Sequence, residues 1–273
     1  MKQHFAWLGT LVCLLVFAVA CSGNPGTDPA SSQGESQPAA EGKEQVEITV
    51  SAAASLKDVM DVIQRTYQDE HPEVHLKFNF GGSGSLQQQI SQGAPVDLFF
   101  SAAEDKFDKL VEDGIIAKED GVDLLGNELV LIVPKGKSAV ASFADLAKPE
   151  IGKLSIGTPE SVPAGKYAKE SLEKMDVWKD VESKVVYAKD VRQVLSYVET
   201  GNVDAGIVYK TDANGSEQAD IVAAADPTTH TPIVYPVGVI KESEHYEAAK
   251  EFYRYLQSEA ALKVFEEYGF TAK

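Results

Sequence analysis

The feature of this chain that most constrains its fold is a regular switch between the two-residue hydrophobic period of strands and the longer period of helices. Glu47–Ala52 alternates and is rich in β-branched residues, which predicts a strand. From Ser55 the apolar residues follow a helical spacing, which Pro72 ends. Two further strand–helix pairs are predicted at Val74–Phe80 with a helix around Leu86 and Ile90, and at Pro95–Ser101 with a helix at Glu104–Glu112. This βαβαβα order predicts an α/β domain with a largely parallel sheet.

The alternation starts again in the second half of the chain, after a strand predicted at Leu129–Val133. Further strands and helices are expected, in chain order, at Lys153–Gly157, Lys166–Met175, Val185–Ala188, 191–198 and Ala205–Tyr209. Two extended crossings, near Gly126–Val130 and Ile233–Gly238, would join the units, and a mostly helical segment over 243–268 would return to the first unit. We therefore predict two α/β lobes joined by a two-strand hinge, with residues 46–127 and 238–273 in lobe 1 and residues 128–237 in lobe 2.

The N-terminal segment is predicted to be an export signal and a tether. Lys2 precedes an apolar run, Phe5–Ala20, which is shorter than the roughly 20 residues of a membrane-spanning helix. Cys21 follows directly and resembles the acylated Cys of bacterial lipoproteins, although Ala18 stands where Leu is more usual. We predict a signal peptide at 1–20, lipidation of Cys21 and a flexible linker over 21–45, which is rich in Ser, Gly, Pro and Gln. The alternative is an ordinary secretory signal with an incidental Cys.

The net charge of the chain limits the kinds of ligand that it can bind. The 273-residue chain has 42 acidic and 25 basic residues and a formal charge of -17. This balance disfavours nucleic acid, because phosphate backbones are bound by patches of Lys and Arg. A small anion remains possible, since local backbone dipoles decide whether it binds. The other Cys, Cys13, lies inside the predicted signal, so a packed core rather than a disulfide should stabilise the mature chain.

Motifs for catalysis or metal binding are weak. His71 and His75 have the i, i+4 spacing of a helical metal pair, but Pro72 between them breaks that helix. The loop at 81–85, Gly-Gly-Ser-Gly-Ser, matches neither a phosphate-binding loop nor a nucleophile elbow. Asp97, inside a predicted strand, is expected to be a structural partner. We predict no catalytic residue, no metal ligand and no cofactor; the alternatives from other classes are an exported enzyme and a surface adhesion module.

Several predicted helices begin with small residues. Ser55 is expected at a helix N-cap after the first strand, and Ser83 and Ser85 are expected in the same place after the second. In the second lobe, a turn at Pro163-Ala164-Gly165 and the pair Asp190-Val191 precede helices. Helix N-termini carry unpaired N–H groups and a partial positive charge, which together form an anion site. A serine in such a position can equally be an ordinary cap.

Motifs along most of the chain point to one family. They are ITVSAAASL (48–56), FNFGGSGSL (78–86), GAPVDLFFSA (93–102), TPESVPAGKYAKE (158–170), KDVRQVL (189–195), AGIVYKTDA (205–213) and VFEEYGF (264–270). In this order they resemble the periplasmic molybdate-binding proteins of ABC importers. The resemblance implies a type II periplasmic-binding fold, with two lobes and a hinge, which agrees with the α/β organisation predicted from periodicity.

The resemblance also implies five residues that contact an oxyanion ligand: Ser55, Ser83, Ala164, Val191 and Tyr209. The two serines would offer hydroxyl and amide donors from the first lobe. The Ala and the Val would offer only backbone N–H groups, and the Tyr would add a phenolic O–H from the second lobe. The sequence leaves open whether Ser85 joins the site. It also leaves open whether Arg192 backs the site or faces solvent.

A site made only of donors suits a fully deprotonated dianion, whose oxygens can only accept hydrogen bonds. Hydrogen phosphate would need an acceptor as well. We therefore expect an extracytoplasmic, monomeric binding protein that captures molybdate or tungstate and delivers it to an ABC permease, with a lipid anchor as its contact with the cell membrane. A protein of the same fold that binds sulfate, an amino acid or a metal chelate is the alternative.

Overall fold

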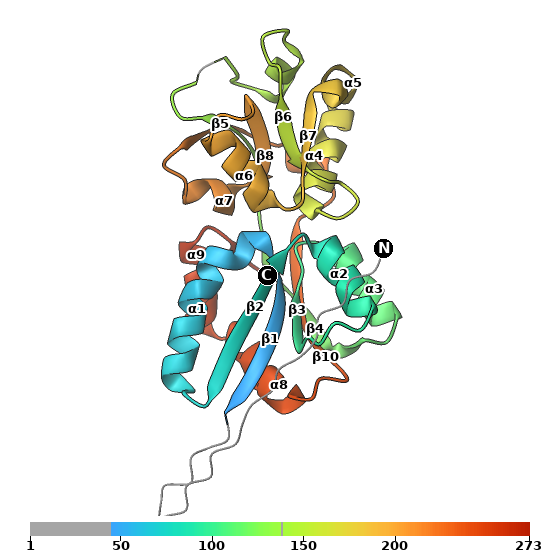
Figure 1. The fold of residues 1–273 in the computed structure, drawn as a ribbon, viewed down its shortest axis with the longest axis vertical. Coiled ribbons are helices and arrows are strands. Elements are labelled where there is room, and N and C mark those ends of the chain that lie inside the picture. The colour runs from blue at the N-terminus through green and yellow to red at the C-terminus, as the bar shows by residue number, and fades with distance from the viewer. Residues whose placement is uncertain (1–44, 138) are drawn as a thin grey trace, which may run out of the picture. The chain divides into compact units, whose positions relative to one another are not determined.

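The computed structural model describes residues 45–137 and 139–273. The predicted signal peptide (1–20), the lipidated Cys21 and the linker as far as residue 44 lie outside the described residues. Within the described ranges, no helix is long and apolar enough to cross a membrane. The strands of this part of the chain form a six-stranded and a five-stranded sheet, and helices pack against both (Figure 1).

The six-stranded sheet, with its helices, is lobe 1. Its strands, from edge to edge, are β11 (Thr271–Ala272), β4 (Ile116–Gly126), β10 (Val234–Ile240), β3 (Leu98–Phe100), β1 (Val46–Ala53) and β2 (Val74–Gly81). β1 is parallel to β2 and β3, but β10 is antiparallel to β3 and β4. The expectation of a largely parallel sheet is therefore wrong for this half of the sheet. The reason is that β4 leaves toward the other lobe and β10 returns from it, so the two run in opposite directions.

The five-stranded sheet, with its helices, is lobe 2. Its order is β7 (Val185–Ala188), β6 (Leu154–Gly157), β8 (Ala205–Tyr209), β5 (Leu129–Pro134) and β9 (Ala219–Ala224). β6 is parallel to β7 and β8, whereas β5 is antiparallel to β8 and β9. The strands at 185–188 and 205–209 have the bounds that the sequence predicts. This sheet is mixed for the same reason as the first, since β5 is the strand that arrives from lobe 1.

Helices follow the strands in both lobes. Lobe 1 contains α1 (Lys57–Glu70), α2 (Ser83–Ser91), α3 (Glu104–Glu112), α8 (Tyr246–Leu256), α9 (Glu259–Glu267) and the 3-10 turn η1 (Ala54–Leu56). Lobe 2 contains α4 (Pro163–Lys174), α5 (Trp178–Val181), α6 (Val191–Glu199), α7 (Lys210–Asn214) and the 3-10 turns η2 (Phe143–Ala147), η3 (Glu182–Lys184) and η4 (Pro227–Thr229). In α1, the predicted apolar face is buried, and its Tyr67 ring packs against Phe252 of α8. The helical period thus identifies the face that covers the sheet.

Two crossings join the lobes, as predicted. The first passes from β4 through Asn127 and Glu128 into β5, and the second enters β10. β10 already pairs with β4 at Val234, which lies opposite Gly126. Residues 234–237 are therefore in the sheet of lobe 1, whereas the predicted boundary assigns them to lobe 2. The difference arises because strand pairing, which a single segment does not reveal, fixes where the crossing ends.

Candidate functional site

In lobe 1, the helix starts selected from the sequence lie side by side. β1 and β2 are parallel and in register, with Ala53 beside Gly81 at their carboxyl ends. The chain then enters η1, which contains Ser55, and α2, which begins at Ser83. Because the carboxyl ends of parallel strands meet at one edge of a sheet, both segments present their first backbone N–H groups at that edge.

In lobe 2, two more helix starts share an edge. β6 and β7 are parallel, with Gly157 beside Ala188, and the chain continues from them toward α4 and α6. The predicted turn at 163–165 is instead the first turn of α4, because proline at the first helical position needs no N–H partner and has a helical φ. Gly165 allows this helix to approach β6, since a Cβ atom there would lie 1.9 Å from the carbonyl oxygen of Gly157.

These edges enclose a small cavity between the lobes. It has a volume of about 10 Å³, which is close to the space of one water-sized guest. The residues that line it come from both lobes: Ala53, Ala54, Ser55, Gly81, Gly82, Ser83, Ala102, Val162, Pro163, Ala164, Val191 and Tyr209. All five residues that the resemblance implies are among them. Ser85 is half-buried and is not one of the lining residues.

The two serine hydroxyls are not helix caps, so the expectation that they stand at N-caps is wrong. Ser83 is the first residue of α2, and Gly82 is the N-cap and uses no side-chain bond. Ser55 lies in the 3-10 turn before α1, which also has no side-chain cap. The Ser83 hydroxyl oxygen instead accepts a hydrogen bond from the Ala102 N–H at 2.9 Å. Its own proton is therefore free to point into the cavity.

Tyr209 supplies an unpaired donor. Its hydroxyl is fully buried and has no hydrogen-bond partner among the described residues. Burial raises the pKa of Tyr209 well above its ordinary value, so the phenol keeps its proton. Buried polar groups in proteins nearly always have partners. A hydroxyl donor left unpaired beside a cavity therefore suits a guest that accepts hydrogen bonds.

Among the described residues, none with a charged side chain lines the cavity. The nearby Arg192 neither lines it nor points into solvent alone: its guanidinium donates to both carboxylate oxygens of Asp58, at 2.7 and 3.2 Å. Since Asp58 belongs to α1 and Arg192 to α6, the ion pair links the two lobes. The sequence leaves open whether Arg192 backs the site or faces solvent. In the structure it does neither, and instead forms an ion pair between the lobes beside the site.

Gly82 and Gly84, at the start of α2, allow the two lobes to come into contact. The Gly84 N–H donates to the carbonyl oxygen of Ser161 in lobe 2 at 3.0 Å. A Cβ atom at Gly84 would lie 2.9 Å from the Cα of Ser161, and one at Gly82 would lie 2.7 Å from the Ser161 oxygen. Real Cβ atoms essentially never make contacts this short. The closed arrangement of the lobes thus requires glycine at both positions.

Two polar residues that the sequence reasoning missed form a chain of hydrogen bonds that ends at Ser55. The Tyr235 hydroxyl lies 2.9 Å from the Ser55 hydroxyl oxygen, and the Asn127 side-chain amide donates to the Tyr235 hydroxyl at 3.2 Å. Both residues lie within the crossings predicted at 126–130 and 233–238. A polar side chain in each hinge segment is the signal that could have identified them.

Asp212 of α7, behind the site, has an unusual environment. Its side chain is fully buried, and neither carboxylate oxygen has a hydrogen-bond partner among the described residues. Burial raises the pKa of Asp212 from its usual 3.8 to about 7, although the Arg192 guanidinium 4.0 Å away opposes the shift. The folded protein therefore holds a proton here that the unfolded chain releases above pH 4.

We expect this proton to make stability depend on pH. Between about pH 4 and pH 7, raising the pH favours the unfolded chain, because only the unfolded Asp212 has ionised; the loss is complete above pH 7. Asp212→Asn should remove this dependence. Its melting temperature relative to the unsubstituted protein should rise steadily from pH 4 to pH 7 and then stay constant. Calorimetry of the ligand-free proteins checks this, with exposed Asp61→Asn as control; parallel curves for the unsubstituted protein and Asp212→Asn would refute it.

Asp97 and His71, which the sequence analysis also considered, make contacts that stabilise the fold. Asp97 accepts hydrogen bonds from the Thr49 N–H and the Ser243 hydroxyl, which ties β1 to the end of β10, as expected of a structural partner. His71 stacks on Tyr67 with ring centroids 4.3 Å apart. Within the described ranges, no group of three or more His, Cys, Asp or Glu residues is arranged to hold a metal ion.

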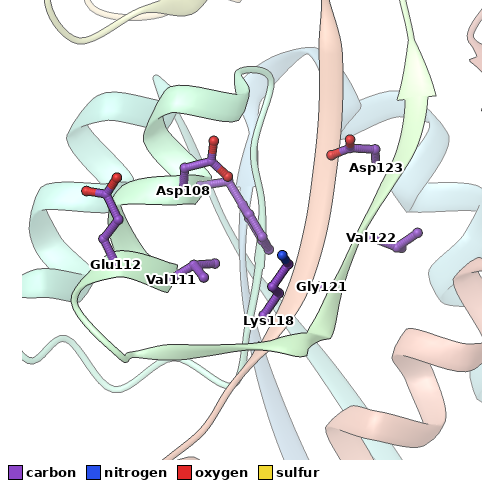
Figure 2. Close-up of a pocket in the computed structure, with 8 residues that line it drawn as sticks. Asp108, Val111, Glu112, Lys118, Gly121, Val122 and Asp123 are labelled. Atoms are coloured by element: carbon purple, nitrogen blue, oxygen red, sulfur yellow. The ribbon is translucent and has the colours of Figure 1, made fainter.

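A larger hollow lies elsewhere on lobe 1, between α3 and β4. This open space has a volume of about 400 Å³. Figure 2 shows Asp108, Glu112 and Asp123 around it, together with Lys118. Burial and the neighbouring Asp123 carboxylate raise the pKa of Asp108. Because three of its four charged groups are acids, this hollow suits an anion poorly.

Comparison with known families decides the class of the protein. The family described as bacterial extracellular solute-binding protein matches residues 48–271, which are nearly all of the described residues. The chain belongs to this family. Solute-binding proteins of this kind hold a ligand rather than transform it, and a site between two lobes is consistent with that role.

Individual relatives match most or all of this chain. The chain is 54% identical over its full length, and over 99% of the relative, to the "Putative ABC transporter substrate-binding lipoprotein YvgL" of Bacillus subtilis. It is 41% identical to the molybdate-binding protein ModA of Haemophilus influenzae, over 83% of this chain and 90% of that one. The periplasmic molybdate-binding protein of Azotobacter vinelandii has the same fold, with a TM-score of 0.74 at 21% identity over 82% of this chain and 98% of that structure.

Proposed function

We propose that the protein captures a tetrahedral oxyanion, molybdate or tungstate, and delivers it to the permease of an ABC importer. The observation that carries the proposal is the cavity between the lobes, which is lined by helix starts and hydroxyl groups and by no charged side chain. The unpaired Tyr209 hydroxyl is the strongest part of that observation, because it needs an acceptor that the described residues do not provide.

The chemistry of the lining supports a dianion. Ser55, Ser83 and Tyr209 supply hydroxyl groups, and the amides at the starts of α2, α4 and α6 have no partner within their own helices. A charge-assisted hydrogen bond contributes about 1.5–3 kcal/mol, so several together can offset the desolvation of two negative charges. The helix dipoles act over short distances at the cavity, whereas salt largely screens the surface charges behind the net charge of -17 when they lie more than about 8–10 Å away.

The size of the cavity supports a small inorganic guest over the organic alternatives. A space of about 10 Å³ is far below that of the pockets that hold drug-sized ligands. Even a tetrahedral oxyanion needs more room than one water, so the lobes would have to open slightly for it, and an amino acid or a metal chelate would require a much larger separation. Sulfate is the remaining competitor, because it is also a tetrahedral dianion. The relatives named for molybdate, at 41% identity, favour the larger anion.

Location and partners complete the proposal. The protein would act outside the cytoplasm as a monomer without cofactor or catalytic activity, and a lipid on Cys21 would hold it at the cell membrane. The full-length similarity to a relative named as a lipoprotein supports the anchor. The anion, held until the lobes open, would pass to the permease.

Calorimetric titration of ligand-stripped protein tests the proposal. Molybdate and tungstate should each bind with one site per chain, sulfate and phosphate should bind more weakly, and a mixture of amino acids should give no heat of binding. Molybdate and tungstate both remaining silent, with the protein folded by circular dichroism, would overturn the assignment. Saturable binding of an organic solute in their place would favour the alternative.

A further inference from the structure

The hydrogen bonds around Ser55 have a direction that can be derived from the number of protons. Ser55 is nearly buried, and Tyr235 is wholly buried, so their contact at 2.9 Å is shielded from solvent. In isolation, either hydroxyl could donate to the other. The direction matters, because a serine that gives its proton to Tyr235 presents only lone pairs to the cavity.

Asn127 fixes the direction. Its side-chain oxygen accepts a hydrogen bond from the Glu128 N–H at 2.8 Å, so the amide group cannot be reversed without placing two donors against each other. Its NH₂ group therefore faces Thr211 and Tyr235, and donates to the Thr211 hydroxyl at 2.9 Å and to the Tyr235 hydroxyl at 3.2 Å. Both amide protons are used.

The proton of Tyr235 then has one destination among the hydrogen bonds of the described residues. The Tyr235 oxygen already accepts from Asn127, and the remaining contact of its hydroxyl is the Ser55 oxygen. Burial raises the pKa of Tyr235 well above its ordinary value, so the phenol does not ionise and keeps this proton to donate. Ser55 is thereby made the acceptor of that bond, and its own O–H is directed to the cavity that it lines.

We propose that Tyr235 and Asn127 are positioning residues that orient the Ser55 hydroxyl as a fixed donor toward the bound anion and so disfavour a protonated oxygen of the guest at this position. The inference rests on the proposed function. A hydroxyl that can rotate accepts a proton from hydrogen phosphate as readily as it donates one to molybdate. A hydroxyl whose lone pair is already used by Tyr235 has lost much of that freedom, and a protonated guest meets proton against proton.

Asn127 and Tyr235, which orient the Ser55 hydroxyl, both lie in the segments that join the two lobes. Asn127 lies in the crossing from β4 to β5, and Tyr235 lies near the start of β10, in the other crossing. The second amide proton of Asn127 is held by Thr211 of α7, in lobe 2. The relay from Asn127 through Tyr235 to Ser55 is therefore complete in the arrangement of the lobes in which the cavity is closed.

Tyr235→Phe is the direct test, because it keeps the ring that packs against Tyr209 and Phe270 and removes only the hydroxyl. The dissociation constants for molybdate and for phosphate at pH 7 are measured by calorimetry in the unsubstituted protein and the variant. We expect molybdate to bind about tenfold more weakly, as for the loss of one oriented hydrogen bond. Phosphate should bind no more weakly than before, so the ratio of the two constants should fall by about tenfold.

Two further variants separate positioning from general disturbance. Tyr167→Phe is the matched control, since its buried hydroxyl also crosses between the lobes, to the Ala102 carbonyl oxygen at 3.4 Å, but does not contact Ser55. It should leave the selectivity ratio unchanged. Asn127→Ala removes the donor that fixes Tyr235 and should lower the ratio in the same direction as Tyr235→Phe, which keeps the test decisive if that variant folds poorly.

The outcomes distinguish this inference from the proposed function. If the unsubstituted protein binds molybdate and Tyr235→Phe or Asn127→Ala shows the same selectivity ratio as Tyr167→Phe, the positioning role is wrong and the proposed function stands. If the unsubstituted protein binds neither molybdate nor tungstate, the proposed function fails and the inference fails with it. A fall in the ratio in both hinge variants alone supports the relay.

Discussion

Replacing Ser55 and Ser83 together by alanine is expected to weaken molybdate binding by at least a hundredfold. Each serine hydroxyl lines the cavity and bonds a neighbour in a way that leaves a proton for the anion. Two charge-assisted hydrogen bonds of about 1.5–3 kcal/mol each correspond to a loss of roughly 10² to 10⁴ in affinity. Calorimetric dissociation constants measure the effect directly.

The same double variant should remain folded. Its ligand-free melting temperature should fall by only a few degrees, because water can enter the cavity and bond the Ala102 N–H and the Tyr235 hydroxyl. Ser85→Ala is the matched control, since Ser85 lies in the first turn of α2 with Ser83 but does not line the cavity, and it should bind molybdate normally. Affinity that survives the double substitution would mean that the two hydroxyls do not contact the ligand.

Gly84→Ala is expected to separate stability from binding, with opposite signs. Within α2, alanine is favoured over glycine by roughly 1 kcal/mol, so the ligand-free protein should melt at the same temperature or slightly higher. Closure of the lobes should suffer, because the new Cβ atom would lie 2.9 Å from the Cα of Ser161. Overpacking of this kind costs about 1–3 kcal/mol, which corresponds to molybdate binding that is about 5- to 150-fold weaker.

The control for this variant also faces the opposite lobe. A Cβ atom at Gly215 would lie 3.9 Å from an Asp58 carboxylate oxygen, an ordinary contact, and its φ of -84° suits alanine. Gly215→Ala should therefore bind normally. Small-angle scattering adds a second measurement: Gly84→Ala should compact less than the unsubstituted protein when molybdate is added. Equal compaction and equal affinity would show that the lobes close without needing glycine at this position.

Periodicity predicts the elements that carry the site, but not the way they pair. The helix at 104–112 and the strands at 185–188 and 205–209 have their predicted bounds, because each is a complete apolar pattern bounded by turn residues. β4 is missed, since Lys118, Glu119 and Asp120 interrupt its alternation. Strand direction across a sheet depends on segments far apart in the chain, which is why the mixed sheets could not be predicted.

In the candidate site, too, local sequence patterns predict some features, whereas contacts between distant residues could not be predicted. A resemblance in the motifs indicates five of the twelve residues that line the cavity. Two of the five, Ala164 and Val191, carry no chemical signal of their own, because a backbone N–H looks alike in every residue. Conversely, the serines were expected to be caps, whereas their hydroxyls bond partners far away in sequence, Tyr235 and Ala102. Contacts between residues 180 positions apart depend on the tertiary fold, so a local pattern cannot reveal them.

A crystal structure of the protein with molybdate, with the metal located by its anomalous scattering, would show whether hydroxyls and backbone amides hold the anion between the lobes. We predict one molybdenum atom between the lobes, with its oxygens accepting hydrogen bonds from the hydroxyls of Ser55, Ser83 and Tyr209 and from the amides of Ala164 and Val191. No Lys or Arg side chain should touch the anion. Molybdate bound elsewhere on the molecule, or held by a clamp of cationic side chains, would contradict the account.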